Sequence, residues 1–146
     1  MPTLTRWYIK SSLAYLVAAL LVGAVLASRA FWPLPAFIRG MGPVYFHLFM
    51  VGWVTQLIFG VVYWLFPKYS KAQPRGNERL GWTIYGLLNA GLLLRVISEP
   101  LNSMQPATIW GWLLVLSAVL QWLAGIGFVA NTWPRVHGGP RRRGAD

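Results

Sequence analysis

The chain has 146 residues, of which 56% are hydrophobic and 11% are charged. A soluble domain carries about 25% charged residues, so this composition excludes a water-soluble globular protein and indicates an integral membrane protein. The absence of cysteine excludes thiol redox chemistry, thiolate metal sites and disulfides. The net charge of +10 lies in loops and tails. It therefore indicates membrane topology and contact with anionic lipid headgroups rather than nucleic acid.

Four stretches are apolar enough to cross a bilayer, which takes about 20 residues each as helix. They predict an all-α fold, an integral membrane four-helix bundle in one domain over 1–134, with spans at about 11–31, 44–66, 80–97 and 108–133. Prolines are expected to separate and end the spans: Pro33 and Pro35, Pro67 and Pro74, Pro100 and Pro106, and Pro134. Residues 135–146 read as a basic, disordered tail.

The first span could be mistaken for a secretory signal. Its apolar run is longer than a usual signal core, however, and Arg29 is unfavourable inside the small-residue cleavage pattern of 28–30. We therefore expect a retained helix.

Basic residues predict the orientation of the four spans. One face would carry ten of them: Arg6, Lys10, Lys68, Lys71, Arg75, Arg79, Arg135, Arg141, Arg142 and Arg143. The other face would carry Arg29 and Arg39, with Arg95 nearby. This bias predicts that both termini are cytoplasmic. A separate expectation is that the protein lies in a bacterial inner membrane.

His47 is the one histidine within the predicted spans, since the only other, His137, lies in the tail. An ionisable group inside a membrane is by default a candidate functional site, and histidine serves as a haem or metal ligand or as a proton relay. The alternative is an interfacial histidine that is hydrogen-bonded to a neighbouring helix or to water.

Arg95 and Glu99 lie four residues apart at a depth similar to that of His47. An intramembrane arginine is costly unless it is paired, so one expectation is a structural ion pair with Glu99. The other is that Arg95 faces an anionic cofactor group, such as a haem propionate.

Small and polar residues mark the second span. Gly52, Gln56 and Gly60 recur at four-residue spacing and form one stripe, which admits either a neighbouring helix or a flat ring. The remaining polar groups inside the spans are expected to hydrogen-bond between helices: Thr55, Asn89 and Gln121, together with Gln56.

A resemblance to a known family rests on two segments, Phe46-His47-Leu48-Phe49-Met50-Val51-Gly52-Trp53 and Ile58-Phe59-Gly60-Val61-Val62-Tyr63-Trp64-Leu65-Phe66-Pro67. Together they resemble the second transmembrane helix of subunit I in heme-copper oxidases, especially C-type oxidases and nitric oxide reductases, and small four-helix membrane proteins related to it. The match covers about 25 residues. It implies a membrane protein of a respiratory electron-transfer system in which a helix-two histidine ligates a b-type haem.

The chain departs from this family pattern at two positions. The family's haem-ligating histidine lies seven residues before the glycine of Gly-Trp, where this chain has Tyr45, and His47 matches the second histidine of a His-x-His pair. Tyr45 would share the face of the glycine stripe, whereas His47 is turned by about 200°. Trp64 also replaces the usual histidine near the end of the helix. These departures favour a relative that has lost its haem.

Three functions therefore remain open. The first is a haem-associated protein in which His47 binds the iron at a dimer or subunit interface, with Met50 or Met41 as a weakly supported second ligand. The second is a cofactor-free structural or assembly subunit of a larger complex or homo-oligomer. The third is a small oligomeric transporter, disfavoured because the first span holds no carboxylate. Catalysis by the chain alone is not expected, since a copper centre needs several histidines.

Overall fold

The computed structural model describes residues 1–67 and 76–136. All regular structure within these ranges is helical. The elements in chain order are α1 (Thr3–Ala27), the short 3-10 helix η1 (Ser28–Ala30), α2 (Ala36–Arg39), α3 (Gly42–His47), η2 (Leu48–Thr55), α4 (Gln56–Leu65), α5 (Glu78–Met104) and α6 (Thr108–Val136). Because α3, η2 and α4 follow one another without a break, they form one composite helix, Gly42–Leu65.

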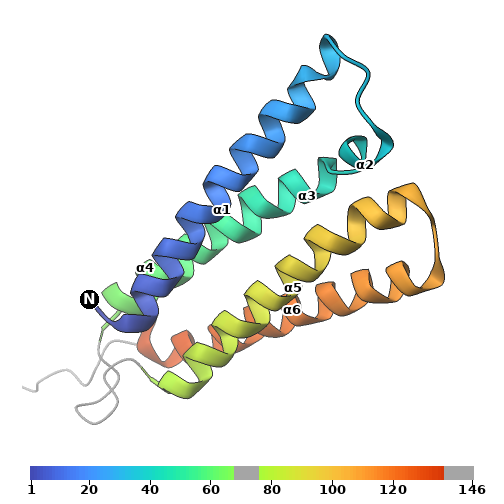
Figure 1. Cartoon of the computed structure of the whole chain (residues 1–146). Coiled ribbons are helices and arrows are strands. Elements are labelled where there is room, and N and C mark those ends of the chain that lie inside the picture. The colour runs from blue at the N-terminus through green and yellow to red at the C-terminus, as the bar shows by residue number, and fades with distance from the viewer. Residues whose placement is uncertain (68–75, 137–146) are drawn as a thin grey trace, which may run out of the picture.

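The helices form two hairpins (Figure 1). In one, α1 runs beside the composite helix, and in the other α5 runs beside α6. We call the end that holds Met1 and Val136 the terminal end, and the end that holds η1 and α2 the distal end. Figure 1 shows α1 and α6 diverging toward the distal end.

Within the described residues, four helices are long and apolar enough to cross a membrane. Their most apolar windows have mean hydropathies of 2.0, 1.8, 1.4 and 2.1 in chain order. The prediction of an all-helical protein with four segments long and apolar enough to span a membrane is confirmed for the described residues. The predicted cytoplasmic location of both termini stays a prediction.

The helices extend beyond the predicted spans. The first helix, α1, begins at Thr3 instead of near residue 11, and α5 continues to Met104 instead of ending near residue 97. Pro100 and Pro134 lie inside α5 and α6, so the expectation that they end helices is wrong. A proline removes one backbone N–H from the helical ladder, and membrane helices tolerate this where neighbouring groups compensate. Pro100 is fully buried, which places it inside the packed part of the fold.

Two hydrophobic clusters hold the bundle together. The cluster toward the terminal end draws on all four long helices: Leu4, Tyr8, Phe59, Tyr63, Ile84, Leu88 and Ala124. Within it, the rings of Phe59 and Phe128 stack at 3.7 Å between α4 and α6. The cluster toward the distal end contains Ala19, Val44, Leu48 and Leu92, from α1, α3, η2 and α5. The core thus includes α6 at the terminal end and leaves it out at the distal end.

Candidate functional site

His47 is the last residue of α3, and its side chain is partly buried. Its Nδ1 lies 2.9 Å from the carbonyl oxygen of Pro43, one turn earlier in the same helix. A carbonyl oxygen can only accept, so Nδ1 carries the proton in this bond and a neutral ring keeps its lone pair on Nε2. Nε2 makes no hydrogen bond within the described residues. A backbone carbonyl that fixes the tautomer in this way is the usual support of a metal-ligating histidine.

A π-helix begins directly after His47 and extends from Leu48 to Thr55. Backbone hydrogen bonds in a π-helix join residues five apart instead of four, and such segments occur often at functional sites. The hydroxyl of Thr55 also donates to the carbonyl of Met50 at 2.8 Å, five residues earlier. Angles calculated for an uninterrupted α-helix therefore do not hold across this segment.

Tyr45 and Gly52 both contact α1, but they differ in burial. The ring of Tyr45 lies on Gly23 of α1, where an added Cβ would come within 2.9 Å of the ring, and the side chain is 37% exposed. Gly52 is buried, and a Cβ added there would lie 2.8 Å from Tyr15 Cβ and 3.0 Å from Leu92 Cδ2.

The glycine stripe of the second span faces α1. A Cβ at Gly60 would lie 2.7 Å from Tyr8 Cβ, just as one at Gly52 would meet Tyr15. Both positions thus let two helices approach closely, which is the commonest use of small residues in membrane helices. In this packing, side chains of α1 occupy the space beside both glycines.

Gln56 lies between the two glycines and is fully buried. Neither its Nε2 nor its Oε1 has a hydrogen-bond partner within the described residues. The expected bond between helices is therefore not formed there. A buried amide without a partner costs roughly 1–3 kcal/mol.

Arg95 belongs to a polar cluster between α5 and α6. Its Nη1 lies 3.7 Å from Glu99 Oε1, with exposed side-chain fractions of 16% and 17%, and its Nε donates to Ser117 Oγ at 3.3 Å. The Ser117 hydroxyl donates to the carbonyl of Gly91 at 2.7 Å and accepts from Gln121 at 3.1 Å. The predicted pair with Glu99 is present, and Arg95 already has two partners in this chain.

His47 and Arg95 lie at a similar level of the bundle. Val44 and Leu48, which flank His47, share one cluster with Leu92, and Val96 packs against that cluster. No hydrogen bond or ion pair joins His47 to Arg95 within the part of the chain that the structure describes. The same part contains no group of three or more histidine, cysteine or carboxylate side chains that could hold a metal ion.

The two methionines weighed as second ligands differ in setting. Met41 packs against the distal cluster, whereas Met50 is exposed. No hydrogen bond joins either one to His47 within the described residues. Neither methionine is therefore placed by a hydrogen bond as a second axial ligand within the described residues.

Sequence reasoning missed one buried cation at the terminal end. Arg135, assigned to a disordered tail, lies inside α6 and is buried. Its guanidinium donates to the carbonyls of Pro67 at 3.1 Å, Phe66 at 2.7 Å and Tyr63 at 3.3 Å. It thereby satisfies carbonyls at the end of α4, which is a typical role of a cation there. The rest of the predicted tail, 137–146, lies outside the described residues.

Two polar contacts join α1 to α5, and sequence reasoning anticipated only the part of Asn89 in them. The hydroxyls of Ser11 and Tyr85 lie 2.6 Å apart, and the Tyr15 hydroxyl donates to Asn89 Oδ1 at 2.8 Å. On each helix the two residues are four positions apart, so each pair shares a face. That spacing is the signal that could have revealed them. The Asn89 contact agrees with the expected hydrogen bond between helices.

Comparison of the chain with family models, curated proteins and solved structures gives no match. The class that the fold defines is an all-helical protein whose described part has four helices long and apolar enough to span a membrane.

Proposed function

We propose that this protein is a subunit of a membrane electron-transfer assembly, and that His47 supplies one axial ligand to a b-type haem bound between this chain and a partner. The supporting observation is the 2.9 Å hydrogen bond between Nδ1 and the carbonyl of Pro43, which leaves the lone pair of Nε2 to bind iron. The resemblance of residues 46–67 to the second helix of oxidase subunit I agrees with this role.

The residues present fit such a haem in one respect and not in another. The His47 imidazole fits one axial position. The glycine stripe does not fit the porphyrin, because Tyr15 and Tyr8 of α1 already fill the space beside Gly52 and Gly60. Arg95 is likewise engaged with Glu99 and Ser117 rather than left for a propionate. The ring would therefore lie outside this chain's own core, against a second copy or another subunit.

A bound haem would supply one-electron transfer, and the chain's own residues would set its position. Pro43 holds the imidazole through Nδ1, and the packing of Val44 and Leu48 in the distal cluster fixes the backbone on both sides of it. The second axial ligand comes from the partner in this proposal. With two histidines in the whole sequence, a copper centre of the oxidase type has too few ligands.

The test is the visible spectrum of the full chain, purified in detergent from membranes that contain its natural partners and adequate haem. We expect a Soret band and a reduced α-band from the wild type, and loss of both in His47→Gln. His137→Gln is the matched control because it removes the only other histidine, and it should keep the spectrum. A colourless wild type, or a variant at His47 that retains haem, would refute the proposal.

A second candidate function is a cofactor-free structural subunit of a larger membrane complex. The observation that favours it is the closure of the glycine stripe by α1, since the fold leaves no flat slot there. It predicts that partner chains purify together with this protein in fixed ratio and without a chromophore. A colourless protein that purifies alone from native membranes would contradict both candidates.

A further inference from the structure

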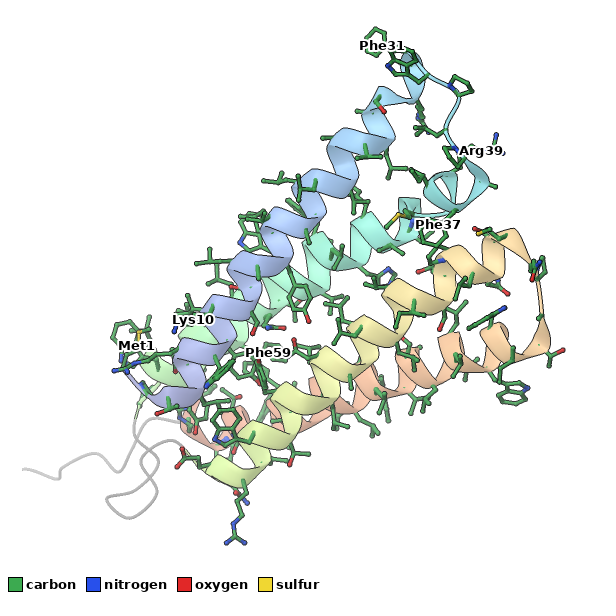
Figure 2. All side chains as sticks on the ribbon, viewed as in Figure 1. Met1, Lys10, Phe31, Phe37, Arg39 and Phe59 are labelled. Carbon is green, nitrogen blue, oxygen red and sulfur yellow. The ribbon has the colours of Figure 1, made fainter. Side chains whose placement is uncertain are left out.

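A partly open hollow of about 280 Å³ lies along the link between α1 and α2 at the distal end. Backbone N–H groups of Phe31 and Trp32 both donate to the carbonyl of Ser28, at 2.9 and 3.1 Å, and fold the link back at the end of η1. The hollow is lined by Leu26, Arg29, Trp32, Pro33, Leu34 and Arg39. Figure 2 labels Phe31 and Arg39 at this end, and Met1 and Lys10 toward the other end. Two arginines from separate elements thus meet at one cavity.

The two arginines of the hollow have no acidic counterpart. Neither Arg29 nor Arg39 makes an ion pair with any described residue. The sequence has three acidic residues. Of these, Glu99 is paired with Arg95, Glu78 begins α5 at the terminal end, and Asp146 lies outside the described residues. Both arginine side chains are exposed and lie at one hollow without a described acidic partner. Two guanidinium groups in this arrangement favour phosphate.

The position of the hollow matches the headgroup level of a bilayer. Phe31 and Trp32 are 83% and 70% exposed just beyond the end of the first apolar helix. Aromatic side chains with this placement mark the interface between membrane and water. Leu26 and Leu34 add an apolar wall beside the two cations. A volume of 280 Å³ is at the small end for a ligand pocket and admits a headgroup, but not a whole lipid.

We propose that this hollow binds the phosphate of an anionic phospholipid, with Arg29 and Arg39 on the phosphate oxygens and the leucines along the start of the acyl chain. Inorganic phosphate offers the same oxygens to the arginines. It has no apolar part for Leu26 and Leu34, and so it should bind more weakly than the lipid. This inference does not depend on haem.

The test is native mass spectrometry of the full chain in non-ionic detergent, titrated with phosphatidylglycerol or with phosphatidylcholine of identical acyl chains. We expect the wild type to bind phosphatidylglycerol at least tenfold more tightly, roughly the preference that two nearby cations give. The pair Arg29→Gln/Arg39→Gln should reduce this binding to the level of phosphatidylcholine. The control pair Arg6→Gln/Lys10→Gln removes the same charge from exposed positions nearer the terminal end and should leave the affinity within about twofold.

Four results would overturn the proposal: no preference for phosphatidylglycerol in the wild type, an equal loss in the control pair, no loss in the Arg29/Arg39 pair, or inorganic phosphate that displaces the lipid at equal concentration. If the double variant does not fold, the single variants Arg29→Gln and Arg39→Gln replace it. Each should lose about threefold or more in affinity. Unchanged affinity in both would also refute the site. His47→Gln should bind the lipid like the wild type, so a negative result in this test leaves the haem proposal unaffected.

Discussion

The two ends of the molecule are built differently. At the terminal end all four long helices share one core, and Arg135 of α6 bonds three carbonyls at the end of α4. At the distal end the hydrophobic cluster contains no residue of α6. His47 and the hollow between Arg29 and Arg39 lie toward this end. The packing that all four long helices share thus lies away from the residues for which we propose functions.

A second contact strengthens the terminal end. Asn131 of α6 accepts from the backbone N–H of Asn77 at 3.1 Å, and the Asn77 side chain accepts from Leu80 N at 3.2 Å, which caps α5. The residue before, Gly76, has a φ of +76°, and a Cβ there would lie 2.7 Å from Asn131 Oδ1. The start of α5 is therefore held against α6 by side-chain contacts with backbone.

The largest effect should come from Arg135→Ala. It removes three hydrogen bonds from a buried cation to carbonyls of residues 63, 66 and 67. We expect a loss of about 3 kcal/mol in the free energy of unfolding, because bonds to charged donors are stronger than neutral ones. The measurement is unfolding by SDS in mixed micelles, with the exposed Arg6→Ala as control. Equal stability of the two variants would mean that the terminal end is not held by this residue.

A smaller effect is expected from Gly60→Ala compared with Gly111→Ala. At Gly60 toward the terminal end, the new Cβ would lie 2.7 Å from Tyr8 Cβ, so α1 must shift, at a cost of about 2 kcal/mol. At Gly111 toward the distal end, nothing lies within 4 Å, and alanine should be neutral or slightly stabilising as a better helix former. Thermal melting of both variants in one detergent checks the contrast. Similar melting temperatures would contradict the difference in packing between the two ends.

Much of the fold follows from the sequence, because a run of about 20 apolar residues is a local property that defines a membrane helix by itself. The π-helix at Leu48–Thr55 was not predictable, since the residues of this segment also satisfy an α-helical pattern. Arg135 was assigned to the tail because Pro134 reads as a helix end, and only the carbonyls that Arg135 bonds reveal its role. Helix ends are thus less visible in the sequence than helix centres.

The candidate site was predictable only in part. The sequence indicated that His47 and Arg95 lie at a similar depth, and the shared distal cluster places their neighbours together. It could not decide whether Gly52 and Gly60 adjoin a helix or a ring, because both need the same absence of a Cβ. Only the positions of Tyr8 and Tyr15 on α1 resolve the packing within this chain.

Gln56→Leu should stabilise the protein, unlike the two substitutions above, with a gain of about 1 kcal/mol in the free energy of unfolding. Leucine replaces a fully buried amide that has no hydrogen-bond partner within the described residues. The matched control is Gln121→Leu, which removes a donor to Ser117 and should lower stability. SDS unfolding of both variants gives the comparison. A destabilised Gln56→Leu would show that the amide has a partner, such as a water molecule or another chain, between the two ends.

The smallest effect should come from Glu99→Gln toward the distal end. The ion pair with Arg95 is long, at 3.7 Å, and the other oxygen, Oε2, has no partner within the described residues. We expect a loss of about 0.5 kcal/mol, as for polar contacts between membrane residues in general. Ser117→Ala should cost more, because that hydroxyl contacts Gly91, Arg95 and Gln121 and links α5 to α6. If Glu99→Gln instead lowers stability more than Ser117→Ala in SDS unfolding, the ion pair within α5 contributes more at this end than the serine that links α5 to α6.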